Sequence, residues 1–421
     1  MHRPLHTLFL FIASAVAVVS GAVLHRAWAP DAQRVCYLQH AIPFRVLNAL
    51  PHDETTFTQG LFVDPINSSR LYESSGLRFR SRLQHVELPT GRVLQTARVE
   101  PASLFAEGAA YRAFDDAIVV LTLSAGRALT FDRTELRYRF GQDIPYGPSG
   151  AWGLAAVHWD HLAACPGALR QWTCSDSEHC LRRDEEPACF LMSNGSSIIT
   201  VRHPRTLAWL TSFPALHHPC SGEQVSSLNE LEVVMRPAAN RPERFPELWA
   251  NIWLSSNIVV MDICAGLERQ RHALFVGELN LSVLALERTA QGPSPVHPVH
   301  PDAVLNGIAW DANRPRNLYV TGKWWRKLYT LELGLREHVA GHTSRGAARH
   351  QRALLRLMRT LLIVAVLVMA ISGLVRVLVR IRRRLADGLT ISRTQNDDTS
   401  RKLTAEVQAT RELVARKMAS H

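Results

Sequence analysis

Short apolar runs separated by polar turns dominate the chain between residues 44 and 335. The runs are rich in β-branched and aromatic side chains and are bounded by Gly, Pro, Asn and Asp, as is typical of strands. No long stretch with helical periodicity occurs before residue 345. The clearest expected strands are Arg70–Glu73, Ser81–Leu88, Arg92–Val99, Ala117–Thr122, Ser197–Val201, Leu231–Val234, Leu248–Trp253, Ile258–Ile263 and Leu318–Val320. This pattern predicts an all-β sandwich, barrel or propeller.

A weak internal repeat favours the propeller. Ser81–Gly91, Ser197–Thr206 and Asn257–Gly266 each contain two or three apolar residues, one polar residue, another apolar residue and then a turn. In the first copy, Pro89-Thr90-Gly91 predicts a hairpin turn. Repeated units of this kind are typical of propeller blades, which surround a central funnel. We therefore expect residues that are distant in the sequence to meet at one site.

Two longer apolar segments flank the strand-rich region. Leu8–Leu24 follows Arg3 and predicts a signal peptide or signal anchor, with Ala27-Trp28-Ala29 resembling a cleavage site. Leu361–Val375 holds fifteen uncharged residues, and flanking arginines extend it towards a transmembrane helix of about 20–25 residues. A buried helix is the alternative for the second segment. The expected domains are 1–29 (signal peptide or anchor), 30–340 (propeller), 354–380 (transmembrane helix) and 381–421 (basic cytosolic tail).

The positive charge is concentrated in the tail. The 421 residues include 48 Lys and Arg and 37 Asp and Glu, which gives a net charge of +11. Residues 341–421 hold 16 basic and 5 acidic residues, so residues 1–340 hold 32 of each sign. A neutral body gives no reason to expect nucleic-acid binding. The arginines after Val375 place the tail in the cytosol and the propeller in a lumen or outside the cell. Residues 402–418 predict a short amphipathic helix.

Four of the seven cysteines lie in the polar stretch 161–190, which interrupts the strand pattern; they are Cys165, Cys174, Cys180 and Cys189. In an oxidising compartment they predict an insertion held by two internal disulfides. A zinc knuckle is the alternative, although the spacings lack the CxxC form. Cys36, Cys220 and Cys264 remain, so at least one thiol has no partner within the chain.

A second insertion, residues 281–303, ends in alternating prolines and histidines and predicts an exposed loop. Its His297 and His300 leave metal binding as an alternative. Asn67, Asn194 and Asn280 each begin an Asn-x-Ser triplet, which predicts glycosylation in a secretory compartment.

Several polar and aromatic residues stand in apolar or glycine-rich surroundings. Lys323 lies between Gly322 and two tryptophans, where aromatic faces can fix the direction of its ammonium group. Each such residue taken singly is more often structural. Six motifs nevertheless occur in one order: FTQGL at 57–61, YESSGL at 72–77, WGL at 152–154, LNELE at 228–232, ANIW at 250–253, and LNGIAWD with TGKWW within 305–325.

Together these motifs resemble the glutamine cyclotransferase family, the plant-type and bacterial glutaminyl-peptide cyclotransferases. The resemblance covers roughly residues 44–335 apart from the two insertions. It implies a five-bladed β-propeller that converts the N-terminal glutamine of peptides or proteins to pyroglutamate and releases ammonia. It implies no cofactor and no catalytic metal. The alternative is a catalytically inactive, membrane-anchored propeller that binds peptides or glycans.

The resemblance also suggests roles for individual residues. Glu73 is expected to transfer the proton from the attacking amine to the leaving nitrogen, with Lys323 and Asn229 stabilising the oxyanion. The expected substrate-binding residues are Phe57, Gln59, Trp152 and Trp253. The expected partners are peptides or proteins with an N-terminal glutamine, and the membrane through the C-terminal helix.

Three positions depart from the family pattern. Leu123 stands where a QLTW motif has tryptophan, and we expect this change to reshape the pocket. Asn194 replaces the aspartate of an SDGS motif, and Ser74-Ser75-Gly76 replaces STG.

Overall fold

The computed structural model describes the propeller region almost completely. The described residues are 36–37, 39–145, 150–165, 167, 186–215, 218–238, 241–268, 273–290, 300–334, 373, 377–379, 381, 398, 400–409 and 411–412. The chain divides into two units, Met1–His338 and Val339–His421. In the second unit, residues 400–409 and 411–412 are helical, as the sequence predicts for that stretch.

The terminal segments are only partly covered by the described residues. Residues 1–29 lie outside them, as do all residues of 354–380 except 373 and 377–379. Where the structure describes the chain, no helix combines the length and apolar character needed to cross a membrane. The signal segment, the transmembrane helix and the cytosolic placement of the tail therefore stay predictions.

The described strands of the first unit form five antiparallel sheets of four strands each. We call these sheets blades I to V and give each from its innermost to its outermost strand. Blade I is β2 (Thr58–Val63), β3 (Arg70–Ser75), β4 (Arg82–Glu87) and β5 (Arg92–Arg98); blade II is β6 (Ala106–Arg112), β7 (Ala117–Thr122), β8 (Arg127–Asp132) and β9 (Tyr138–Asp143); blade III is β10 (Leu154–Val157), β11 (Cys189–Met192), β12 (Ile198–Arg202) and β13 (Trp209–Pro214). Blade IV is β14 (Leu228–Ala238), β15 (Arg241–Ile252), β16 (Asn257–Asp262) and β17 (Leu274–Asn280); blade V is β18 (Leu305–Trp310), β19 (Asn317–Gly322), β20 (Lys327–Leu333) and β1 (Phe44–Pro51).

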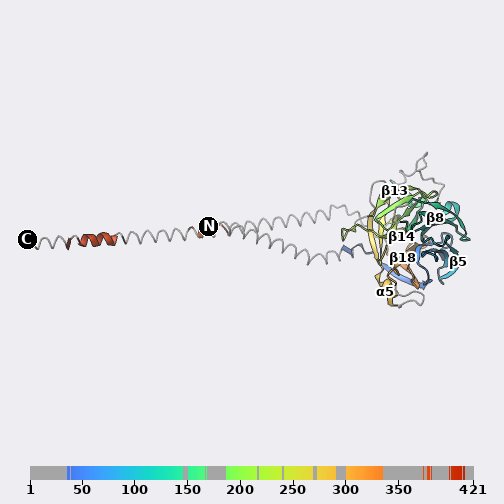
Figure 1. Ribbon diagram of the computed structural model, residues 1–421, viewed down its shortest axis with the longest axis horizontal. Coiled ribbons are helices and arrows are strands. Elements are labelled where there is room, and N and C mark those ends of the chain that lie inside the picture. The colour runs from blue at the N-terminus through green and yellow to red at the C-terminus, as the bar shows by residue number, and fades with distance from the viewer. Residues whose placement is uncertain are drawn as a thin grey trace, which may run out of the picture. The chain divides into compact units, whose positions relative to one another are not determined.

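The five innermost strands meet around a common axis. Each of β2, β6, β10, β14 and β18 contacts the innermost strands of the two adjacent blades, and β18 contacts β2 to complete the ring (Figure 1). Blade V combines the two ends of the propeller sequence. Strand β1, from the N-terminal end, pairs with β20 and forms the outer edge of this blade. The predicted five-bladed all-β propeller is thus confirmed.

The core of the propeller lies between the blades. Among the described residues, the buried apolar side chains form five clusters, one at each boundary between adjacent blades. Strand β7 shows how one strand serves two boundaries. Ile118 and Val120 pack towards blade I, whereas Val119 and Leu121 pack towards blade III. Successive side chains point to opposite faces of a strand, so both faces of β7 are apolar and buried.

The three copies of the sequence repeat occupy equivalent positions in their blades. They fall on β4, β12 and β16, which are the third strands of blades I, III and IV. All nine strands expected from the apolar runs are present, with bounds that differ by a few residues.

Two expectations are wrong. Residues 282–290 of the second insertion are not a loop but helix α5 (Ser282–Ala290), whose Leu284 packs into the cluster between blades IV and V. The cysteines also pair differently, because Cys165 bonds to Cys264 and not to another cysteine of the first insertion.

The fold accounts for this pairing. Cys165 follows helix α2 (Trp159–Ala163), Cys264 begins helix α4 (Cys264–Leu267), and both helices lie against the cluster between blades III and IV. Cys189 lies on β11, buried in that cluster with its thiol free. Cys174 and Cys180 lie outside the described residues.

Candidate functional site

One mouth of the propeller channel holds a pocket of about 410 Å³. It lies where the innermost strands begin, and its lining also includes the turn between β19 and β20 and the segment before β18. Its lining residues are Phe57, Gln59, Leu77, Phe105, Glu107, Leu123, Trp152, Asn229, Trp253, His300, Asp302, Lys323 and Trp324. Six of the seven residues predicted from the sequence are therefore brought together, and Glu73 is the exception.

Glu107 on β6 is the carboxyl group of this pocket that lies deepest in the protein. Its side chain is nearly inaccessible, with 3% of the residue exposed. Oε1 accepts a hydrogen bond from Gln59 Nε2 at 3.1 Å. Among the described residues, Oε2 has no hydrogen-bond partner. Burial raises the pKa of Glu107 well above that of an ordinary carboxyl, although the charge of Lys323 opposes this shift.

Lys323 is the cation of the pocket. It is 4% exposed, and its Nζ lies 4.6 Å from the centre of the Phe57 ring. Burial lowers the pKa of Lys323, whereas the negative charges of Glu107 and Asp302 act to raise it. Each of the two groups therefore helps to keep the other charged within a largely apolar pocket.

The turn that carries Lys323 is fixed by backbone contacts. Trp324 adopts a left-handed conformation with a φ of 61°, which is strained for a bulky residue. Its N–H donates to Thr56 O at 2.8 Å, and its ring packs edge-on against Phe57 with centroids 4.6 Å apart. These contacts hold the strained turn and fix where Lys323 enters the pocket.

Gln59 connects Glu107 to the channel axis. Asn306 Nδ2 donates to Gln59 Oε1 at 3.0 Å and also to Thr58 O at 2.8 Å. Because the carbonyl oxygen of Gln59 is held in this way, its Nε2 is directed at Glu107. Gln59 is thus placed to orient the carboxyl group, in addition to lining the pocket.

Aromatic rings form the walls. Trp152 and Trp253 meet edge-to-face with centroids 5.7 Å apart on one side, and Phe57 and Phe105 do so at 5.9 Å on the other. Leu123 lines the same pocket, as expected from its place in the sequence. A compact apolar substrate fragment fits between such walls, and water is displaced when it enters.

Asn229 adds a neutral polar group at the start of β14. It is 2% exposed, and its backbone oxygen accepts a hydrogen bond from Ser193 Oγ at 2.6 Å. Its side-chain Oδ1 has no hydrogen-bond partner among the described residues. As placed, this oxygen can accept a hydrogen bond from an amine in the pocket.

Glu73 lies outside the pocket lining, beneath the Lys323 turn. Its Oε1 accepts a hydrogen bond from Thr58 Oγ1 at 2.6 Å and lies 2.9 Å from His52 Nε2. The other ring nitrogen of His52 donates to the carbonyl oxygen of Trp325 at 2.6 Å. Burial lowers the pKa of His52, but the charge and hydrogen bonding of Glu73 outweigh this effect and raise it. Glu73 and His52 therefore form a buried ion pair that anchors the turn.

Sequence reasoning missed Glu107, and a signal for it existed. Gln59, Trp152 and Asn306 each stand directly before a glycine at the start of an innermost strand, and Glu107 does the same in Ala106-Glu107-Gly108. The same reasoning missed Phe105, His300 and Asp302 as lining residues.

A second cavity of about 590 Å³ lies at the opposite ends of the innermost strands. Burial raises the pKa of its Glu232 to about 8. Its Asp64 is already paired with His85 Nε2 at 3.1 Å. The described residues that line this cavity include neither lysine nor arginine, so it offers no permanent cation to stabilise a developing negative charge.

In the described part of the chain, one set of His, Cys, Asp or Glu donors gathers closely enough to hold an ion, namely Cys36, His40 and Cys220. None of these three residues lines the pocket.

Comparisons with known proteins show which family this chain resembles. The sequence model of the glutamine cyclotransferase family matches residues 17–171 and 183–333. A glutaminyl-peptide cyclotransferase of Arabidopsis thaliana is 26% identical over 324 residues, which cover 76% of this chain and 82% of the relative. A crystal structure of the glutaminyl cyclase of Myxococcus xanthus is 22% identical and covers 70% of this chain and 98% of its own, with a TM-score of 0.49. Because the family match spans well over half of the chain, the protein belongs to the glutamine cyclotransferase family.

Proposed function

We propose that this protein is a glutaminyl-peptide cyclotransferase, which cyclises the N-terminal glutamine of peptides or proteins to pyroglutamate and releases ammonia. One structural observation supports this assignment most directly. Glu107, a buried carboxyl group whose Oε2 has no hydrogen-bond partner among the described residues, lines the same aromatic-walled pocket as the buried ammonium group of Lys323. The family match and the Arabidopsis relative support the same activity.

The reaction is intramolecular, so positioning is the main task of the protein. The α-amine of the substrate must attack the carboxamide carbon of its own side chain, and the walls formed by Trp152, Trp253 and Phe57 favour the folded, ring-like pose. Orientation of this kind lowers a barrier by several kcal/mol. The acceptor oxygen of Asn229 is placed to hold the amine.

Proton transfer is assigned to Glu107. As the new N–C bond forms, the carboxylate removes a proton from the attacking amine; it then delivers this proton to the carboxamide nitrogen as that C–N bond breaks and ammonia leaves. Glu107 ends in the state in which it began. Its raised pKa suits both steps, because it binds and releases a proton nearer neutral pH than an ordinary carboxyl group does. The ammonium group of Lys323 stabilises the oxyanion of the tetrahedral intermediate.

Replacing Glu107 with Gln is expected to lower kcat for ammonia release from a Gln-initiated dipeptide by about 10²–10⁴-fold, since the proton carrier is lost. Glu232→Gln is the matched control, because Glu232 is also an innermost-strand carboxyl group with a raised pKa but lines the other cavity. It should keep near-normal turnover. Normal turnover by Glu107→Gln would contradict the mechanism. No release by the folded wild-type protein with several Gln peptides would favour the inactive, ligand-binding alternative.

The pH profile should reveal the coupling between Glu107 and Lys323. The positive charge of Lys323 lowers the pKa of Glu107, so its removal in Lys323→Met raises that pKa further. Catalysis needs the carboxylate and is lost as pH falls through this pKa. The acid limb of the residual kcat profile should therefore move to higher pH.

Lys327→Met is the control for this measurement. Lys327 pairs with Glu287 at the surface and does not line the pocket, so the acid limb should stay where it is in the wild type. An acid limb that moves to lower pH in Lys323→Met would refute the proposed coupling.

Glu73 is proposed to support the Lys323 turn and to take no part in proton transfer. Glu73→Gln leaves His52 buried without its counter-charge, and breaking a buried pair costs about 3–5 kcal/mol of unfolding free energy. The raised pKa of His52 sets the sign of the pH dependence. The loss should be complete below the His52 pKa of the unfolded chain and should diminish as pH rises through the raised value.

Urea unfolding at several pH values measures this loss. The kcat of the folded Glu73→Gln protein should fall by less than about tenfold, in contrast to the larger loss for Glu107→Gln. Unchanged stability combined with a kcat loss as large as that of Glu107→Gln would return the proton transfer to Glu73.

We further propose that the protein is anchored by residues 354–380, with the propeller on the lumenal or extracellular side and the basic tail in the cytosol. The apolar run Leu361–Val375 and the arginines that follow it support this arrangement. The exposed Asn67 and Asn280 are the most accessible of the three proposed glycosylation sites. After alkaline extraction of membranes, the full chain should stay in the pellet and a chain ending at residue 340 should be released. Release of both would exclude the anchor.

A further inference from the structure

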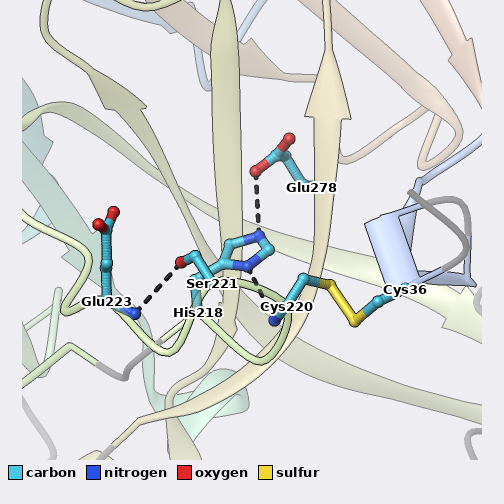
Figure 2. The surroundings of a disulfide bond; sticks show 6 residues. All are labelled: Cys36, His218, Cys220, Ser221, Glu223 and Glu278. Atoms are coloured by element: carbon cyan, nitrogen blue, oxygen red, sulfur yellow. Dashed lines mark hydrogen bonds and ion pairs between the residues drawn. A yellow bond between two sulfur atoms is a disulfide. The ribbon is translucent and has the colours of Figure 1, made fainter. Parts of the chain in front are cut away.

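A disulfide joins the segment before the propeller to the connection between blades III and IV. Cys36 bonds to Cys220, which is 184 positions away in the connection between β13 and β14 (Figure 2). Residues 36–37 and 39–40 are helical. Neither cysteine is fully buried, so the bond can be reached from solvent.

His40 completes a three-donor cluster with the two cysteines. The two sulfur atoms and a ring nitrogen of His40 all lie within 4.8 Å of one another. Cys36 and His40 are four positions apart on a helical stretch, so both side chains face the same side. Zinc sites commonly take two donors from one short helical segment and a third from a distant loop.

Contacts other than the disulfide hold the cluster together. Ala41 forms a parallel bridge with Glu278 on β17, and Ile42 N–H donates to Glu278 O at 2.8 Å, which fixes the chain next to His40. On the other side, His218 Nδ1 accepts a hydrogen bond from Cys220 N–H at 3.2 Å (Figure 2).

The imidazole rings of this corner are also packed in place. The His218 ring lies 4.8 Å from the Phe275 ring, centre to centre, and the His40 ring lies 5.5 Å from the same Phe275. Glu278 Oε2 lies 3.3 Å from His218 Nε2 and orients that ring, as Figure 2 shows. The positions of His40 and Cys220 are therefore supported by contacts that remain when the sulfur–sulfur bond is absent.

We propose that Cys36, Cys220 and His40 form a redox-gated Zn²⁺ site, closed by the disulfide and opened by its reduction. A dithiol transfers two electrons and two protons to the disulfide, which yields two thiols and the oxidised, cyclic form of the dithiol. Zn²⁺ then binds the two sulfur atoms as thiolates and releases two protons. The neutral His40 ring supplies the third ligand, and water takes the fourth position.

The required movement is small. Two thiolates on a tetrahedral Zn²⁺ lie about 3.8 Å apart, since each Zn–S bond is about 2.3 Å long. The Cα atoms of Cys36 and Cys220 are 5.5 Å apart, so side-chain rotation can separate the sulfur atoms without moving the backbone. His218, held by Glu278 and by the Cys220 backbone, positions Cys220 and is not itself assigned as a ligand.

Cobalt substitution tests this site in the full-length protein. The chain is reduced anaerobically with dithiothreitol, freed of it and titrated with Co²⁺. We expect a single equivalent to produce thiolate-to-cobalt charge-transfer and tetrahedral ligand-field bands, which Zn²⁺ then abolishes. The oxidised protein should show neither band. His40→Ala should weaken Co²⁺ binding by at least about tenfold, as the loss of a ligand does more than the loss of an outer partner.

The control is the double variant Cys36→Ser with Cys220→Ser. It keeps the other five cysteines, Cys165, Cys174, Cys180, Cys189 and Cys264, and should give no charge-transfer band. Absence of the bands in the reduced wild type would overturn the proposal, and so would bands that persist in the double variant or do not depend on His40. Circular dichroism at the same step must show the native fold, because a site that exists only in an unfolded chain would also refute it.

Discussion

The close approach of the innermost strands around the channel axis is the constraint on which the rest of the structure depends. A Cβ atom added to Gly60 would lie 2.4 Å from Ala109 N, and one added to Gly108 would lie 2.5 Å from Leu154 N. No side chain can be placed there without a backbone shift, so the blades meet backbone to backbone. In blade IV, where no glycine stands at the equivalent place, Glu230 accepts hydrogen bonds from Ile308 N–H at 2.8 Å and from Leu61 N–H at 3.4 Å. The residue before each of these positions is thereby fixed at the mouth of the channel.

Within this frame, two buried glutamates, Glu73 and Glu107, stand in different surroundings. Glu73 accepts hydrogen bonds at Oε1 from Thr58 and His52 and does not line the pocket, so it is suited to stabilising the turn above it. Glu107 lines the pocket and accepts a hydrogen bond from Gln59 at Oε1, whereas its Oε2 has no hydrogen-bond partner among the described residues. A substrate in the pocket can therefore donate a hydrogen bond to Glu107 Oε2.

Much of the fold could be predicted from the sequence because propeller strands carry strong local signals. Strand β7, for example, is apolar along almost its whole length, and both of its faces are buried between blades. The pocket was predictable as a set of motifs, but the choice between Glu73 and Glu107 was not, because both stand in apolar surroundings and only the three-dimensional structure shows that Glu107 lines the pocket and Glu73 does not. The pairing of Cys165 with Cys264 depends on two helices that are distant in the sequence and come together only in the fold. Helix α5 was missed because prolines near its end dominate the local pattern.

The measurement that tests the account most directly is a crystal structure of the protein with a bound pyroglutamyl peptide. We expect the lactam ring to lie against the wall formed by Trp152 and Trp253, with its carbonyl oxygen about 2.7–3.1 Å from Lys323 Nζ and its ring nitrogen within hydrogen-bond reach of Glu107. Binding of the lactam in the cavity at the opposite ends of the innermost strands, or in the pocket without contact to Glu107, would contradict it.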